Sequence, residues 1–377
     1  MSSAENKKRI FFPNLDGLRF FCFFFVFMVH SFVSERAEIN NNPMHIFLKK
    51  FLFAGGHLGV NMFFVLSGFL ITYLLVKEKE LSGSISIKNF YVRRILRIWP
   101  LYFFCVFFGF VLFPYFKTMF GQVSTETANP LYYFIFASNF DLIRTGGADS
   151  SMLNILWSVS IEEQFYLFWP LVVLLVPAKR LWVVLIAVIF LSNIYRVLYY
   201  QNLGIEVHTF SAANDLAIGC LMACIALQKN KIQNALLSLK LSGYLIAHLF
   251  FIILFIVFHQ VDLGVFDFLK RVFFAISFAI VIFLQCFSAI QIWALGKFKW
   301  ISSLGEYTYG LYCLHMIAIL IVTTLLNKFL PNYSVTIMFL FIFPITLILS
   351  IAFAKISFRY FESYFLKLKN KFSIITK

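Results

Sequence analysis

The first long apolar stretch of the chain contains three ionisable side chains, Asp16, Arg19 and His30. Ionisable groups within a membrane span cost several kcal/mol, so each one marks a candidate functional site. Arg19 and His30 are eleven residues apart, which turns a helix by about 1100°, or three turns and about 20°. The two side chains therefore share one helix face and lie about 16 Å apart along its axis. That face carries an anion-binding group at one end and a titratable base at the other.

Both residues also have an interpretation that involves no chemistry. Arg19 fits an anchor whose guanidinium group extends to the membrane surface. His30 fits a hydrogen-bonded packing residue, although an imidazole is also the side chain best suited to exchange a proton near neutral pH. The shared face keeps the functional interpretation open beside the structural one.

Two adjacent acids, Glu162 and Glu163, follow Trp157 near the start of another helical stretch, which also contains Tyr166. Carboxylates in a first helical turn interact favourably with the helix dipole, so a capping role is one interpretation. Adjacent residues point about 100° apart, so we expect at most one of the acids to face the centre of a bundle. This helix end is predicted on the same side of the membrane as His30. We therefore hypothesise that one acid orients or stabilises the imidazole.

Three arginines, Arg93, Arg94 and Arg97, precede a third apolar stretch. Arg93 and Arg97 are neighbours on one helix face, whereas Arg94 points elsewhere. Guanidinium groups suit the bidentate recognition of phosphate. The phosphates of a nucleotide-bearing donor are therefore one candidate ligand, and anchoring of the helix by positive charge on the cytoplasmic side is the alternative.

Two further segments combine small and polar residues. Segment 55–70 is rich in glycine and contains Ser67, and its small residues favour close helix packing. Segment 303–315 contains Tyr309 and His315. These two side chains suit the lining of a polar cavity and, equally, a structural hydrogen-bond network.

Membrane-spanning helices must position these residues. The chain has 377 residues, of which 61% are hydrophobic and 13% charged, whereas soluble domains carry about 25% charged residues. A span needs about 20 residues to cross the hydrocarbon core. We therefore predict an all-α, polytopic transmembrane bundle of about ten spans, at residues 16–34, 58–76, 95–115, 156–176, 181–200, 211–227, 241–259, 271–290, 304–326 and 335–356.

The distribution of lysine and arginine predicts that both termini are cytoplasmic, because most of the 32 basic residues then lie on the cytoplasmic side. The longest outer loop, 116–155, includes the apolar stretch 131–138. This stretch is too short to cross, so we predict a re-entrant or interfacial piece. We expect residues 1–377 to form one integral membrane domain with short cytoplasmic tails at 1–14 and 357–377 and no additional soluble domain.

Composition and motifs argue against several other classes. The net charge of +15 is explained by topology, and no basic, aromatic module for nucleic acid stands outside the spans. The six cysteines form no CxxC pair and the histidines show no metal-ligand spacing, so we expect neither a metal site nor a disulfide framework. The sequence also lacks the GxSxG, Walker and Rossmann fingerprints.

Taken together, five segments resemble the acyltransferase-3 family of integral membrane proteins. They are Leu15–Arg19 followed by ten residues and His30, then Gly59–Leu70, Arg93–Tyr102, Trp157–Tyr166 and Tyr309–His315, in the family's order. The resemblance implies O-acylation, usually O-acetylation, of sugars in cell-envelope polysaccharides, lipopolysaccharide or related glycans at the bacterial cytoplasmic membrane. It also implies an acyl-CoA, such as acetyl-CoA, as cytoplasmic co-substrate, with no tightly bound cofactor.

The resemblance also implies roles for individual residues. The family's Arg-x10-His motif maps onto Arg19 and His30, its basic motif onto the arginines at 93, 94 and 97, and its acidic motif onto Glu162 and Glu163. Substrate-contacting or structural polar roles are expected for Asp16, Ser67, Trp157, Tyr166, Tyr309 and His315.

Two positions depart from the family's pattern. Asn61 stands where many members have an aspartate, which puts a carboxylate role there in doubt. Segment 208–215 lacks the basic residue that members often place ahead of the acid, which here is Asp215. Substrate contacts in this segment are therefore expected to differ.

The hypothesis from the sequence is that acyl-CoA binds from the cytoplasm with its phosphates near the arginines at 19 and 93–97. His30 then either acts as general base on a sugar hydroxyl or first accepts the acyl group itself. The expected partners are the lipid bilayer, the acyl-CoA donor and a carbohydrate acceptor. A glycan or lipid-linked transporter or flippase is the main alternative, although the paired repeats of many transporters are not evident. A non-catalytic scaffold is the second alternative.

Overall fold

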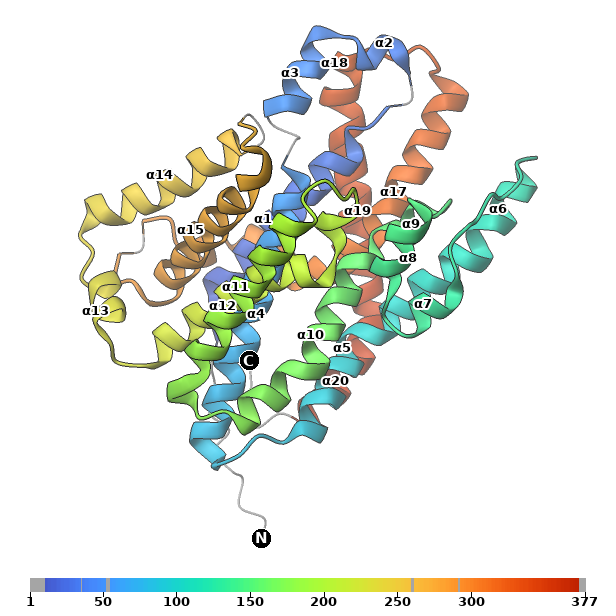
Figure 1. Ribbon diagram of the computed structural model, residues 1–377. Coiled ribbons are helices and arrows are strands. Elements are labelled where there is room, and N and C mark those ends of the chain that lie inside the picture. Colours follow the sequence, from blue (N-terminus) through green and yellow to red (C-terminus); the bar gives the residue numbers. More distant parts are fainter. Residues whose placement is uncertain (1–10, 35, 52–54, 259–260, 291, 373–377) are drawn as a thin grey trace.

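The computed structural model describes residues 11–34, 36–51, 55–258, 261–290 and 292–372. Every regular element within these ranges is a helix, which confirms the predicted all-α class (Figure 1). The basic residues Lys7–Arg9 and the residue His259 lie outside the described residues. The long helices are α1 (Pro13–Ser31), α4 (Gly56–Ser82), α5 (Ile87–Phe107), α10 (Leu156–Leu175), α11 (Leu181–Leu198), α12 (Thr209–Leu227), α14 (Leu241–Val257), α15 (Asp267–Phe287), α17 (Thr308–Phe329) and α19 (Phe343–Ser357).

Shorter elements connect and extend these helices. The short α-helices are α2 (Ala37–Asn40), α3 (Pro43–Phe51), α6 (Phe113–Met119), α7 (Pro130–Phe134), α8 (Ser138–Thr145), α9 (Ser151–Asn154), α13 (Lys231–Leu237), α16 (Lys299–Glu306), α18 (Val335–Ile337) and α20 (Ser363–Lys369). Single π-helical turns join consecutive helices at η1 (Phe108–Leu112), η6 (Met338–Ile342) and η7 (Phe358–Glu362). Single 3-10 turns form η2 (Ala178–Arg180), η3 (Ile205–Val207), η4 (Gly264–Phe266), η5 (Leu295–Lys297) and η8 (Asn370–Phe372).

Each of the ten predicted spans contains a helix, but not every one of these helices is long and apolar enough on its own to cross a membrane. Among the described residues, seven helices are long and apolar enough to cross a membrane, or eight if the bent pair α13 and α14 is counted as one span. Neither α1 nor α15 belongs to this set. The charged groups of Asp16 and Arg19 lower the hydropathy of α1, which is only 19 residues long.

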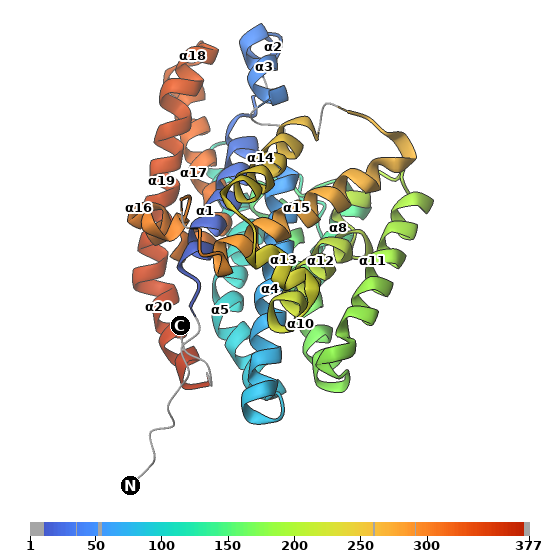
Figure 2. The same ribbon diagram turned by 90° about the vertical axis from the view of Figure 1, so that its left-hand side faces the viewer.

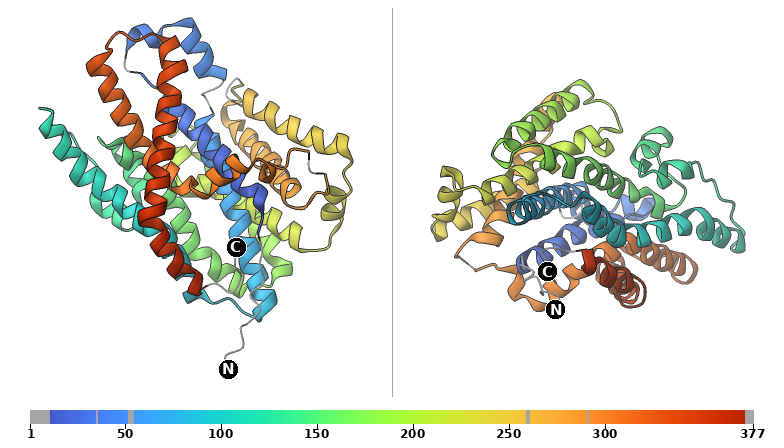
Figure 3. Two further views of the ribbon diagram at one scale, coloured as in Figure 1. Left: turned by 180° about the vertical axis from the view of Figure 1, so that it is seen from behind. Right: turned by 90° about the horizontal axis from the view of Figure 1, so that it is seen from below.

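Helix α1 lies inside the bundle beside α4, α16 and α17, and Figure 3 shows α1 and α4 near the middle when the bundle is seen from below. Close backbone contacts fix these helices. A Cβ atom on Gly68 of α4 would lie 2.1 Å from the backbone oxygen of Leu216 in α12. A Cβ atom on Gly305 of α16 would lie 1.9 Å from the backbone oxygen of Asp16. Only glycine allows these approaches, as the glycine-rich segment predicts for α4.

The predicted outer loop is ordered and packs against the bundle. Its apolar stretch forms α7 and the start of α8 and does not cross. The hydroxyl of Tyr102 in α5 donates to the backbone oxygen of Tyr133 at 2.9 Å. The hydroxyls of Ser138 and of Ser160 in α10 are 2.7 Å apart. The loop therefore holds α5 and α10 together at this end.

The C-terminal part differs from the prediction, because the last long helix does not end near residue 356. It continues through η7 into α20 and η8. Arg93 in α5 donates to the backbone oxygen of Phe372 at 2.8 Å. Figure 2 shows α20 and the lower end of α4 at one end of the bundle and α2, α3 and α18 at the other. Residues 357–372, predicted as part of a tail, are therefore helical and packed on the bundle.

An ionic network joins α11, α12 and α15, and within it Glu206 is partly exposed whereas Arg271 and Asp215 are buried. Arg271 of α15 contacts Asp215 of α12 at 2.7 Å, and neither side chain is more than 1% exposed. Arg271 also pairs with Glu206 of η3 at 2.5 Å, and Arg196 of α11 pairs with the same carboxylate. The base that segment 208–215 lacks is thus supplied to Asp215 by another helix.

Glu206 lies outside the membrane-spanning segments, and its pKa is set by this network. Burial alone would raise the pKa of Glu206, but Arg271 and Arg196 outweigh burial and lower the pKa from 4.5 to about 2. Because the pKa is lower in the folded state, the carboxylate contributes stability that is complete above its unfolded value and is lost as the pH falls toward about 2.

We therefore predict that acid destabilises the wild-type protein partly through Glu206. The thermal unfolding temperature of Glu206→Gln in detergent should lie below that of the wild type at neutral pH, and the gap should narrow as the pH falls from about 5 to about 2. Glu38→Gln is the control, because the Glu38 side chain is 78% exposed and such surface pairs contribute little. A gap that stays constant with pH would contradict the prediction.

Candidate active site

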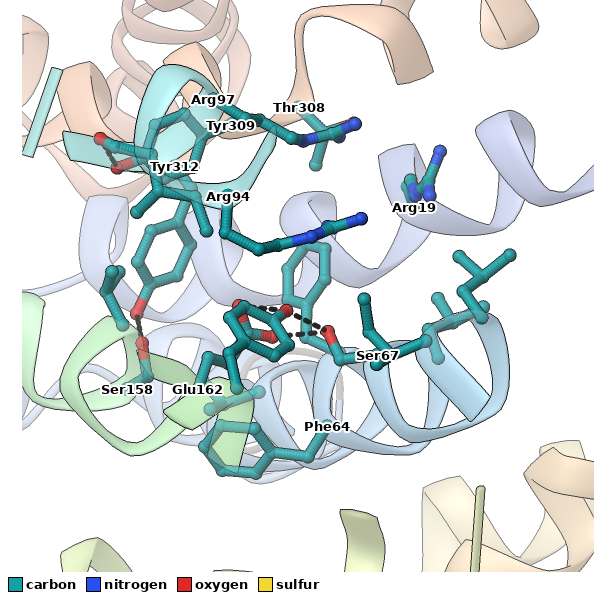
Figure 4. A pocket seen from close by; sticks show the side chains of 18 of the residues that line it. Arg19, Phe64, Ser67, Arg94, Arg97, Ser158, Glu162, Thr308, Tyr309 and Tyr312 are labelled. Atoms are coloured by element: carbon teal, nitrogen blue, oxygen red, sulfur yellow. Dashed lines mark hydrogen bonds between the residues drawn. The ribbon is translucent and has the colours of Figure 1, made fainter. Parts of the chain in front are cut away.

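Two neighbouring cavities lie inside the bundle beside α1. The first, of about 180 Å³, is lined by residues of α1, α4, α5, α10 and α17 (Figure 4). The second, of about 170 Å³, extends toward Phe11 and Lys369. Both cavities are lined by Arg19, Arg94 and Arg97. Together they extend from the end of the bundle that carries α20 toward its middle.

The guanidinium groups of Arg19, Arg94 and Arg97 point into this shared space (Figure 4). Arg19 forms an ion pair with the buried Asp16 at 2.6 Å. The Nε atom of Arg94 is buried and has no hydrogen-bond partner among the described residues. Three guanidinium groups that face one shared space make this part of the cavity suited to an anionic ligand.

Arg93 is placed differently from the other two arginines of its motif. It pairs with the buried Glu78 of α4 at 3.0 Å and donates to Phe372. Arg93 lines the second cavity only. Its contacts fasten α5 to α4 and to the C-terminal segment. The sequence did not single out Glu78, because its charged neighbours Lys77, Lys79 and Glu80 are typical of a solvent-exposed helix end.

Of the two adjacent acids, Glu162 faces the cavity and Glu163 does not line it, as their angular spacing predicts. The hydroxyl of Ser67 donates to Glu162 Oε1 at 2.5 Å, and the hydroxyl of Tyr166 donates to Oε2 at 3.2 Å. The Nε1 atom of Trp99 donates to Glu163 at 2.9 Å. The structure thus brings Ser67 of α4 to Glu162 and Tyr166, which lie one helical turn apart in α10.

The inner end of the cavity is closed by side chains of α10 and α17. The hydroxyl oxygens of Tyr312 and Ser158 are 2.5 Å apart, and Tyr309 donates to the backbone oxygen of Ile98 at 2.8 Å. Trp157 packs its ring on Phe64, with centroids 6.1 Å apart. Tyr309 therefore forms a hydrogen bond at the cavity wall, whereas Trp157 packs on Phe64, which lines the cavity. Tyr312 and Ser158 lay within predicted motifs, but their pairing carried no signal in the sequence.

His30 lies beyond this end, at the opposite end of α1 from Arg19. Its Nδ1 atom is 2.8 Å from Nε2 of His315 in α17. The ring planes differ by 7° and the centroids are 5.1 Å apart. The close nitrogen contact excludes face-to-face stacking, so the rings lie edge to edge with the hydrogen bond nearly in their common plane. His315 is fully buried, whereas His30 is half-buried.

The partner of His30 differs from the one hypothesised. The carboxylates of Glu162 and Glu163 make their hydrogen bonds to Ser67, Tyr166 and Trp99, and the imidazole partner is His315. Arg19 and His30 lie on the same side of α1, the side that faces α17. Arg19 lines the cavity together with Thr308 and Tyr309 of α17, and His30 contacts His315 of the same helix. Asn61, one of the two departures from the family pattern, is buried in α4.

Comparisons with known proteins identify relatives of this chain. The chain is 27% identical over 373 residues to the O-acetyltransferase OatA of Staphylococcus aureus (strain NCTC 8325 / PS 47), which covers 93% of this chain and 56% of that protein. It is 28% identical over 350 residues to the peptidoglycan O-acetyltransferase OatA of Listeria monocytogenes, which covers 88% of this chain and 53% of that protein. The chain therefore spans about half the length of these curated relatives. No solved structure matches it significantly.

The family of the chain follows from a match along nearly its whole length. Residues 12–355 match the acyltransferase domain family, and this range contains all five segments on which the resemblance rests. It also contains the arginine-lined cavity and the His30–His315 pair. The chain belongs to the acyltransferase-3 family of membrane acyltransferases.

Proposed function

We propose that this chain is a membrane O-acetyltransferase that moves an acetyl group from cytoplasmic acetyl-CoA to a hydroxyl group of a cell-envelope glycan. The observation that carries the proposal is the arrangement of ionisable groups along α1. Arg19 lines the cavity together with Arg94 and Arg97, and His30 lies at the other end of the same helix, beyond the closed end of that cavity. An anion site and a titratable base on opposite ends of one helix suit a reaction between substrates from opposite sides of a membrane.

The donor end is suited to the phosphates of a coenzyme A thioester. Three guanidinium groups offer charge-assisted hydrogen bonds to phosphate oxygens, and the buried Nε of Arg94 lacks a partner among the described residues. Apolar side chains such as Val60 and Phe63 also line the cavity, which is closed by Tyr312 and Ser158. A pantetheine arm would extend in that direction and bring the thioester toward the end of the cavity near α17.

The acceptor end is suited to a hydroxyl group. His30 takes the proton of the acceptor hydroxyl, the oxygen attacks the thioester carbonyl, and the carbon–sulfur bond breaks. The proton then passes to the departing thiolate, so the imidazole is regenerated. Transfer through an acyl group on His30 is the alternative chemistry. The relatives named as peptidoglycan O-acetyltransferases favour a peptidoglycan sugar over lipopolysaccharide as acceptor. The site of action would be the bacterial cytoplasmic membrane.

The first test replaces the base. We predict that His30→Ala lowers transfer of labelled acetyl from acetyl-CoA to peptidoglycan fragments by about 10² to 10⁴, the usual contribution of a general base. The measurement uses purified protein in lipid nanodiscs with mass spectrometry of the glycan. His208→Asn is the matched control, because His208 lies in a different part of the chain and stacks on Tyr195. Full transfer by His30→Ala would refute the proposal, and movement of an unmodified glycan would favour a transporter.

The second test addresses the donor site. We predict that Arg97→Met raises the KM for acetyl-CoA about tenfold, which corresponds to about 1.4 kcal/mol of lost binding. The same variant should leave the KM for acetyl-pantetheine, which lacks the nucleotide phosphates, nearly unchanged. Arg180→Met is the control, because Arg180 in η2 does not line either cavity. An equal rise in the KM for both donors would show that Arg97 does not bind the nucleotide phosphates.

A further inference from the structure

The hydrogen bonds of His315 determine which of its nitrogens carries a proton. Its Nδ1 atom lies 2.7 Å from the backbone oxygen of Tyr312 and 3.2 Å from that of Leu311. Carbonyl oxygens only accept hydrogen bonds, so Nδ1 must be the N–H of this ring. A neutral imidazole has one N–H, and Nε2 of His315 therefore carries a lone pair.

The position of the proton on His315 in turn determines the position of the proton on His30. Nε2 of His315 accepts, so Nδ1 of His30, 2.8 Å away, must donate. The remaining nitrogen of His30, Nε2, then carries a lone pair. The near coplanarity of the rings, within 7°, aligns the N–H of one ring with the lone pair of the other.

The opposite assignment requires a charge on His315. Nε2 of His315 could donate to His30 only if both nitrogens of His315 were protonated. His315 is 0% exposed, and the rings of Phe23 and Phe27 pack against it edge-on. A buried cation without a carboxylate partner is costly. The assignment in which both rings are neutral, with Nδ1 of each ring as the donor, is therefore favoured.

We propose that His315 is a positioning residue that fixes the tautomer of His30 and so makes Nε2 of His30 the atom that takes the acceptor's proton. This inference rests on the proposed role of His30 as a base. When His30 gains the proton, its Nδ1–H remains directed at Nε2 of His315, and the bond becomes charge-assisted and stronger. His315 thus stabilises the imidazolium that forms during transfer, while it never contacts the substrate or exchanges its own proton.

A purely structural role predicts a different response to substitution. If His315 only fills space between Phe23 and Phe27, an apolar residue of similar size would serve. If it acts through Nε2, the replacement must place a hydrogen-bond acceptor at that position. The side-chain oxygen of glutamine reaches the position of Nε2, whereas the shorter asparagine reaches only that of Nδ1. Glutamine, asparagine and leucine therefore separate the two roles.

The experiment compares His315→Gln, His315→Asn and His315→Leu in lipid nanodiscs with acetyl-CoA and peptidoglycan fragments. We expect kcat to fall about 100-fold in the asparagine and leucine variants, with the KM for acetyl-CoA unchanged, and to recover to within about tenfold of the wild type in the glutamine variant. Equal activity of the leucine and glutamine variants would overturn the inference, as would a loss confined to KM.

A spectroscopic measurement keeps the test independent of activity. In protein labelled with ¹⁵N-histidine, the signals of His30 are identified by their absence from His30→Ala. They should show a protonated Nδ1 and an unprotonated Nε2 in the wild type and in His315→Gln. His315→Leu should lose this preference. An unchanged tautomer in His315→Leu, or a protonated Nε2 in the wild type, would overturn the inference.

The outcomes also separate this inference from the proposed function. If His30→Ala remains active, the base itself is misassigned and the proposed function fails. If His30→Ala is inactive while His315→Leu transfers acetyl at the wild-type rate, the proposed function stands and the role of His315 fails.

Discussion

The cost of placing charged groups inside an apolar bundle is the constraint on which this structure depends. A buried charge is tolerated only when it is paired and hydrogen-bonded. Most buried charges in the described part of the chain meet that condition. Glu78 is paired with Arg93, and Asp215 is paired with Arg271. These ion pairs hold together helices that are distinct in the sequence, within an otherwise apolar interior.

The cavity is where this pairing is incomplete. Arg94 has a buried Nε without a partner among the described residues, and its guanidinium group lies between the rings of Phe90 and Tyr166 instead of against a carboxylate. Arg19 and Arg97 share the same space. Arg19 is paired with Asp16, but a buried polar atom without a partner is costly, so the Nε atom of Arg94 favours an anionic ligand that completes its hydrogen bonding when bound. This reasoning applies to Arg94 more strongly than to Arg93, whose carboxylate partner is already present.

Close packing converts these local features into one site. The glycine contacts of α4 with α12 and of α16 with α1 allow backbones to approach without intervening side chains. The result is that Ser67 reaches Glu162 of α10, and the end of α1 reaches α17. A shift of either helix would separate His30 from His315, because a hydrogen bond weakens steeply with small changes of distance and angle. The proposed role of His30 as a base therefore depends on the rigidity of the scaffold.

The sequence by itself determined the helical class, the helix in each predicted span and the placement of Arg19 and His30 on one side of α1. It also determined that only one of Glu162 and Glu163 would face inward. These features follow from hydrophobicity and from the period of the helix, which are local properties of the chain. The family resemblance added the expected chemistry of the segments, and the match over residues 12–355 established the family.

Only the tertiary structure decided which side chains meet. His30 bonds to a residue 285 positions away, Glu162 meets Ser67 rather than His30, and Asp215 finds its base in α15. It also decided that α16 and α17 are separate helices and that the last helix continues to α20. Such pairings depend on the rotation, tilt and depth of each helix against its neighbours. No single helix carries that information, because several rotations bury its apolar surface equally well.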